Sequence, residues 1–244
     1  MSLREEYDVI QGRGLTVEAI QFCYKIAGSD EIALHFELIR RDNSKPRGER
    51  IHLAAHFDKH GRSGMLYLAQ FLENSDDMLA ADAAYLMAES LHLEHRRSQC
   101  DPDNTLLPNL LNALRRLTHS PLEECRRRAI IALAWLAEES DIDIFISHLK
   151  NDADELCRAW SASAFLQMSF HLSKDVLQKR GAAALLYCLE HEIDVFVLGC
   201  AVEAIAEIWQ KRLGLSGAAV ERRDAAAVEK ARRRAVRMLE KNGG

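Results

Sequence analysis

The sequence has few residues that break a chain into short elements. Its 244 residues include only 4 prolines and 12 glycines, and aromatic residues make up 7% of it. Many short strands would need frequent turns, so this scarcity argues against an all-β fold. Nowhere does an apolar run reach the roughly eighteen residues that a membrane-spanning helix needs. The composition therefore excludes a membrane helix and favours an all-helical protein.

Paired cysteines are also lacking. Six cysteines occur, but no two have the CxxC spacing, which argues against a zinc or disulfide framework. Most lie in apolar stretches, where a reduced thiol packs as a small hydrophobic group. The opening residues, MSLREEYDVIQG, contain no apolar segment of the kind that a signal peptide needs. We therefore expect reduced thiols, a cytoplasmic location and no cofactor.

A strong positive charge is absent as well. The formal net charge is −5 and the pI is near 6.1, whereas nucleic-acid binders cluster Lys and Arg to contact phosphates. The charge is uneven, because residues 200–244 hold ten Lys and Arg against six Asp and Glu, a net of +4 that leaves −9 on residues 1–199. Such a basic segment is more typical of a solvated helix face than of a phosphate-binding arm. Nucleic acid is therefore not the expected partner.

What the sequence does contain is a helix face that repeats. Leucines at positions 72, 117, 149 and 189 define one column, and small or bulky apolar residues recur at fixed distances after each of them. The first such column holds only small residues, and further members follow at offsets of 3, 4 and 7, which describe one face of an α-helix. The four columns are Ala84, Ala129, Ser161 and Ala201; Met87, Ala132, Ala164 and Ala204; Ala88, Leu133, Phe165 and Ile205; and Leu91, Leu136, Met168 and Ile208. The pattern predicts repeated pairs of antiparallel helices.

Capping signals predict where these helices begin. The stretch Ser120-Pro121-Leu122-Glu123 has the pattern of a capping box with proline at the first helical position, so we expect a helix from there to about Glu138. Upstream, the segment ERIHLAAHFDKH predicts one further helix after a polar loop.

The second-helix stretches AAYLMAESL, AIIALAWLA, SASAFLQMS and AVEAIAEIW resemble those of the HEAT-repeat family and, more loosely, of armadillo-like α-solenoids. The resemblance covers residues 64–212 well. HEAT units commonly carry an aspartate at the turn and an arginine in the second helix. Asp152 and Arg158 match that spacing, and Arg126 fills the arginine column without its aspartate.

The resemblance implies an all-α fold, a right-handed HEAT-like superhelix of about five or six helix pairs. We expect a single domain over residues 1–244, with divergent helices in 1–62, clear repeats in 63–212 and a capping helix in 213–244.

The side of the second helices that faces away from the core predicts a partner site. In such stacks these helices line an extended groove, and apolar patches with a polar rim mark protein interfaces. An alternative is that the final helix, AAAVEKARRRAVRML, folds back over this side as a cap, and another is that the apolar face is used in self-assembly. We favour a non-enzymatic adaptor or scaffold that binds a protein or peptide. The residues predicted for its groove are Trp135, Ile131, Leu166, Phe170, Gln167, Glu89, Glu203 and Glu207.

Three histidines form the one candidate metal site. His52, His56 and His60 recur every four residues, a spacing at which histidines on a helix can chelate zinc. The same spacing is also that of a semi-polar helix face with no metal, which we favour.

Two enzyme families built on HEAT-like stacks give the catalytic alternatives. DNA glycosylases that act on alkylated bases use tryptophans and a catalytic aspartate, for which Asp141 or Asp143 is the candidate, and they are the second interpretation of this chain. Deoxyhypusine hydroxylases need several His-Glu pairs to hold two irons, and this chain has only His191-Glu192. The acidic charge balance disfavours the glycosylase interpretation.

Overall fold

Every regular element in the described part of the chain, residues 1–242, is helical. The computed structural model contains fourteen α-helices and three short 3-10 helices, and no strand among these residues. The predicted all-α, HEAT-like fold class is confirmed. The chain divides into two compact units, Met1–Ala113 and Leu114–Gly244, and α7 (Leu107–Leu117) runs across the division without a break. The single-domain organisation stays a prediction.

The first unit packs its helices around aromatic and aliphatic side chains. α2 and α3 both contact η2, while α4 contacts η2, α5 and α6. Tyr7, Phe22, Phe57, Met65 and Leu68 are among its largest fully buried side chains. Its elements before α7 are α1 (Leu3–Ile10), α2 (Val17–Ala27), α3 (Ile32–Asn43), η1 (Arg47–Glu49), η2 (Leu53–His60), α4 (Gly61–Ala69), α5 (Asp77–Leu91) and α6 (Glu94–Cys100).

The helix predicted in ERIHLAAHFDKH is a 3-10 helix, η2. The Asp42 carboxylate accepts hydrogen bonds from the N–H groups of Ile51 and His52, at 3.1 Å each from Oδ2. His52 adopts the left-handed conformation with φ of 60°, and the Leu53 carbonyl lies 3.2 Å from Nε2 of the buried His35 ring. The first bond of the helix runs from the N–H of Ala55 to the carbonyl of His52, at 3.2 Å, which is the i to i+3 pattern of a 3-10 helix.

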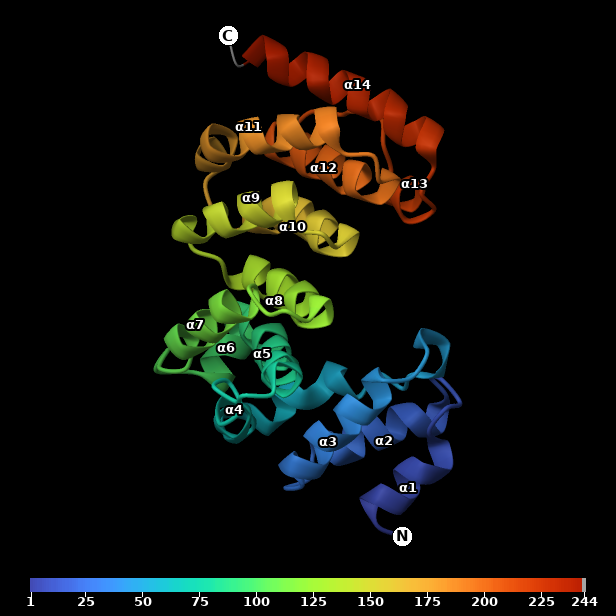
Figure 1. Cartoon of the computed structure of the whole chain (residues 1–244). Helices are drawn as coiled ribbons and strands as arrows, with labels where there is room; N and C mark the ends of the chain where they lie inside the picture. The colour runs from blue at the N-terminus through green and yellow to red at the C-terminus, as the bar shows by residue number, and fades with distance from the viewer. Residues whose placement is uncertain (243–244) are drawn as a thin grey trace. The chain divides into compact units, whose positions relative to one another are not determined.

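The second unit is a stack of helix pairs (Figure 1). The second helices α8, α10 and α12 lie side by side in that order, and α9 and α11 pack beside them. The last helix, α14, packs on α11 and α12. The bounds are α8 (Glu123–Leu136), η3 (Glu139–Asp141), α9 (Ile142–Asn151), α10 (Glu155–Met168), α11 (Lys174–His191), α12 (Val195–Ile208), α13 (Gly217–Glu221) and α14 (Ala225–Asn242).

The four predicted columns form the core in both units. Their members on α5 are all fully buried, and on α8, α10 and α12 none is more than 8% exposed. Small residues at the first position let neighbouring second helices approach closely, and the bulky residues that follow fill the remaining space. The repeat predicted from the sequence is therefore the packing interface itself.

A ladder of arginines links consecutive pairs in the second unit. Arg126 on α8 donates to both carboxylate oxygens of Asp152, at 2.9 and 3.0 Å, and Asp152 lies in the turn of the next pair. Arg158, one pair further on, reaches Glu192 in the same way, with its Nε at 2.7 Å. Each arginine also donates through Nη1 to two carbonyls of the turn before its own helix. The ion-pair partner of Arg126 is therefore the aspartate of the following turn, Asp152, and not a residue of the turn before its own helix. Each of these ion pairs joins one helix pair to the next.

This ladder also explains why α8 begins later than the capping box predicts. α8 starts at Glu123, and the Ser120 hydroxyl accepts from the N–H of Leu122 at 3.2 Å. Arg126 donates to the carbonyls of Ser120 and Pro121, at 3.0 and 3.3 Å. The prediction of a helix start at Pro121 is wrong because those carbonyls serve a side chain instead of a helical turn.

Candidate interaction site

The predicted groove residues of the second unit lie on three adjacent second helices. α8, α10 and α12 present them at matching positions, two to nine residues after the small column. Glu89 is on α5 in the first unit. The other seven are Ile131 and Trp135 on α8, Leu166, Gln167 and Phe170 on or just after α10, and Glu203 and Glu207 on α12.

These side chains differ in how much of them solvent reaches. Phe170, in the turn after α10, is 71% exposed. Trp135 is half-buried, as are Ile131 and Leu166. A second helix in a stack contacts a neighbour on each flank as well as its own first helix, so only a narrow strip stays open. Phe170 is therefore the most accessible apolar residue of the predicted set.

A cleft opens beside the C-terminal ends of α10 and α12. We name it the α10–α12 cleft, and its volume of 730 Å³ lies within the range of ligand pockets. One predicted groove residue of α10 and two of α12 contribute to its wall. The lining residues are Leu166, Glu203, Ala206, Glu207, Gln210, Lys211, Arg212, Leu213, Gly214 and Leu215.

The far wall of the cleft is the loop that follows α12, and several contacts fix its shape. Gln210 and Gly214 both have positive φ, 51° and 79°, which turns the chain back toward α12. Arg234 of α14 donates from Nη1 to the Leu213 carbonyl at 2.9 Å. On the α11 side, Gln178 donates to the Ile208 carbonyl at 3.0 Å, which caps the end of α12. Hydrogen bonds from α14 and α11 therefore fix the loop and the end of α12 that form the cleft.

Acidic groups set the electrostatics on the α12 side of the cleft. Burial raises the pKa of the Glu203 carboxyl, and the charge of Glu221 adds to the rise. Glu207 forms an ion pair with Lys174, 2.6 Å from Nζ to Oε1. Because Glu203 has no ion pair within residues 1–242, its carboxylate would be stabilised by a cation brought into the cleft. Lys211 and Arg212 on the opposite loop supply positive charge to the same opening.

The loop residues were missed by the sequence analysis. Their stretch, KRLGLSG, lies after the last residue of the repeated columns, so no periodicity marks it. The available signal was the glycine at position 214 followed by Ser216, whose hydroxyl accepts from the N–H of Ala219 and caps α13. That signal predicts a turn between two helices, but it does not predict that the turn lies close to Leu166.

The three histidines of the candidate metal site do not converge. In a 3-10 helix, residues four apart point about 120° from one another. Histidines at this spacing therefore do not share one face here, as they would in an α-helix. His60 Nε2 lies 2.8 Å from Nδ1 of His35, and the His56 ring packs on Tyr24 with centroids 4.6 Å apart. Within residues 1–242 no three His, Cys, Asp or Glu side chains are grouped so that they could hold a metal ion.

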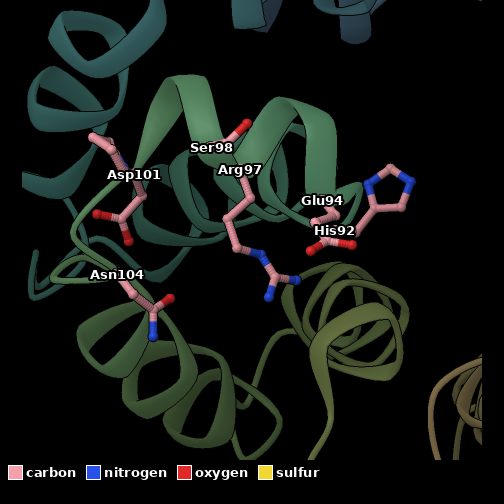
Figure 2. Close-up of a pocket in the computed structure, with 7 residues that line it drawn as sticks. His92, Glu94, Arg97, Ser98, Asp101 and Asn104 are labelled. Atoms are coloured by element: carbon pink, nitrogen blue, oxygen red, sulfur yellow. The ribbon is translucent and has the colours of Figure 1, made fainter.

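A second cavity, of 440 Å³, lies in the first unit around α6 (Figure 2). Figure 2 shows the Arg97 side chain projecting between Glu94 and His92 on one side and Asp101 and Asn104 on the other. Arg97 donates from Nε to the Leu91 carbonyl at 2.8 Å, which ties it to the end of α5. Asp101 accepts from the N–H groups at the start of α7, with the shortest bonds at 3.0 Å. These polar groups are thus already engaged in holding helix ends together.

The aspartate considered for a glycosylase is fully engaged. Asp141 is 1% exposed and accepts from Arg115 at 2.7 and 3.1 Å and from the N–H of Glu138 at 2.9 Å. Asp143, the other candidate, is paired with Arg180 at 2.9 Å on the surface. Among residues 1–242, neither aspartate lines the α10–α12 cleft.

Comparison with known families agrees with the packing. Residues 66–165 match the family model that describes HEAT repeats. Over this segment the chain is similar to HEAT repeats. The matched segment includes α5, α8 and α10 as far as Phe165. The same buried columns continue on α12, beyond the matched segment. No characterised protein and no solved structure matches the chain. HEAT repeats generally mediate protein–protein interaction, and no helix within residues 1–242 is both long and apolar enough to cross a bilayer.

Proposed function

We propose that the protein is a non-enzymatic interaction module that binds a protein or peptide segment in the α10–α12 cleft. The observation that supports the proposal best is the 730 Å³ cleft, which combines the apolar Leu166 and Leu213 with the carboxylate of Glu203. An apolar side chain of the partner would fill the cleft, and a Lys or Arg beside it would pair with Glu203. Such a combination of a desolvated anchor and a charged contact is typical of interface hot spots.

The same surface extends along the stack. Phe170, in the turn after α10, is 71% exposed, and Ile131 and Trp135 are half-buried on α8. A partner in extended or helical form would contact these residues in turn, as ligands of repeat proteins do. We place this module in the cytoplasm, in keeping with six free and buried cysteines among the described residues. The glycosylase interpretation gains no support, because the carboxylate of Asp141 is already bonded.

Site-specific photo-crosslinking tests the proposal. A photoreactive amino acid at Gln210, which is exposed at the cleft, is compared with one at Glu190, which is exposed on α11 away from it. We expect the Gln210 position to crosslink a discrete partner from native lysate. Leu166→Asp should abolish that adduct, whereas the matched control Leu122→Asp, at an exposed leucine outside the cleft, should leave it.

Two further arms keep the result interpretable. Glu203→Arg leaves the apolar wall intact and tests the charged contact by itself, with circular dichroism to confirm the fold of each variant. With the identified partner purified, both cleft variants should weaken its affinity by about tenfold or more. Identical adducts from Gln210 and Glu190, or an adduct that Leu166→Asp leaves unchanged, would refute the cleft as the site.

A further inference from the structure

The last helix carries a basic stripe on its outer side. α14 contains six Lys and Arg against two Glu, a net of +4. At 100° per residue, Lys230, Arg237 and Lys241 fall within an arc of about 40°, and Arg233 and Arg234 flank them. All five are exposed. The opposite face, formed by Val228, Ala231, Ala235 and Leu239, is buried against α11 and α12.

The central cations of this stripe have no partner in the described chain. Arg233 is bonded to Glu229 at 2.7 Å, and Arg234 donates to the Leu213 carbonyl. For Lys230, Arg237 and Lys241 the structure of residues 1–242 records no ion pair and no side-chain hydrogen bond. They are spaced i, i+7 and i+11, so they lie on one straight line that spans about 16 Å along the helix axis.

We propose that this stripe, Lys230, Arg237 and Lys241, docks an acidic α-helix of a partner protein. A helix with one carboxylate per turn brings about three negative charges to a length of 16 Å, which matches the three unpaired cations. A helix is also only about 10 Å wide, so a single row of cations is enough to hold it. Pairs of this kind give specificity and a fast association rate, and they weaken as salt is added.

A nucleic-acid duplex fits the same surface poorly. Over about 16 Å it presents roughly nine phosphate charges, three times what the unpaired cations can neutralise. Glu229 and Glu240 lie on the edge of the stripe, where the second strand of a duplex would approach.

Fluorescence anisotropy with defined probes tests the proposal independently of the α10–α12 cleft. The probe is a labelled, alanine-based helical peptide of about 18 residues with glutamate at i, i+4, i+7 and i+11, compared with its glutamine counterpart and with a DNA duplex of similar length. We expect the glutamate peptide to bind, the glutamine peptide to bind at least about tenfold more weakly, and the duplex to bind less tightly than the glutamate peptide. Binding should weaken between about 50 and 200 mM salt.

Two matched triple variants decide whether the stripe is responsible. Lys230→Glu, Arg237→Glu and Lys241→Glu together should lower the affinity about tenfold or more. Arg13→Glu, Arg47→Glu and Lys59→Glu make the same change in charge at exposed positions of the first unit and should leave the affinity almost unchanged. The milder triple change of the stripe to glutamine should weaken binding too, with melting curves confirming that each variant is folded.

Several outcomes would overturn the proposal. Equal affinity of the stripe variant and the wild-type protein would remove the stripe from the interaction, and equal loss in both triple variants would show an effect of net charge alone. Tighter binding of the duplex would assign the stripe to nucleic acid. Self-association in light scattering that the stripe variant abolishes would assign it to a second copy of this chain.

Discussion

At the scale of single residues, the second unit depends on arginines whose partners lie one helix pair away. The side chain of Arg158 is 19% exposed and that of Glu192 is 9% exposed, so this pair is largely shielded from water. Glu192 also accepts from the N–H groups of Ile193 and Asp194, both at 2.9 Å, which orients its carboxylate. Removing one partner of such a pair leaves the other buried without its charge partner, and this costs more than the pair itself contributes.

We therefore expect Arg158→Ala to lower the free energy of unfolding by about 2–3 kcal/mol. The control is Arg233→Ala, which removes an ion pair to Glu229 with an arginine side chain that is 67% exposed, and should change the free energy by less than about 1 kcal/mol. Urea denaturation of both variants measures the difference. Similar losses in the two variants would show that the ladder is no more than a surface ion pair.

A buried histidine gives the first unit a pH dependence with a defined sign. Burial, followed by the charge of His60, lowers the pKa of His35 to about 4, below its usual value of 6.5. Between these two values the unfolded chain binds a proton that the folded chain does not, so stability is complete above about pH 6.5 and falls as the pH drops toward 4. The loss amounts to at most about 3 kcal/mol.

Thermal melts of the wild-type protein and of His35→Leu between about pH 6.5 and 4.5 check this expectation. The variant should lose part of the slope of stability against pH, whereas His95→Gln, at an exposed histidine of the same unit, should keep it. An unchanged slope in His35→Leu would mean that other groups are responsible.

At the scale of elements, the sequence predicted what is periodic and missed what depends on single side-chain hydrogen bonds. The buried columns on α5, α8, α10 and α12 repeat at helical spacing, so they could be predicted, together with the fold class. Arg126 of α8 donates to the carbonyls of the turn just before this helix, and Asp42 and His35 of α3 bond to the backbone where η2 begins. For the candidate site, the apolar and acidic residues of α10 and α12 were predicted, whereas the loop at 211–215 was not, because only tertiary packing brings it to Leu166.

The contact between α10 and α11 yields a prediction at this scale. Gly181, in the middle of α11, faces the ring of Phe165, and a Cβ added there would lie 2.6 Å from Cε1 of that ring. Alanine stabilises a helix relative to glycine by about 1 kcal/mol, but a rigid ring cannot move aside cheaply. We expect Gly181→Ala to destabilise the protein by about 1–3 kcal/mol in denaturation experiments. Adding Phe165→Leu should recover part of the loss, and a Gly181→Ala variant more stable than wild type would refute the close contact.

At the scale of the whole molecule, the open question is how far the two compact units unfold together. The division falls at Ala113, yet α7 continues through it to Leu117 as one helix. Helix formation is cooperative along a continuous segment, so fraying on one side of the division is opposed by residues on the other. The single domain predicted from the sequence stays a prediction, which an unfolding experiment can test.

We accordingly expect one unfolding transition for the full chain. Hydrogen exchange measured across a urea series should give the same midpoint for amides of α5, in the first unit, and of α10, in the second. The His35→Leu variant tests the coupling directly, because its defect lies in the first unit. If both units unfold as one, the substitution lowers the midpoint for α10 as much as for α5. A lowered midpoint for α5 alone would establish two domains joined by a shared helix, and the α10–α12 cleft would then be a property of the second domain by itself.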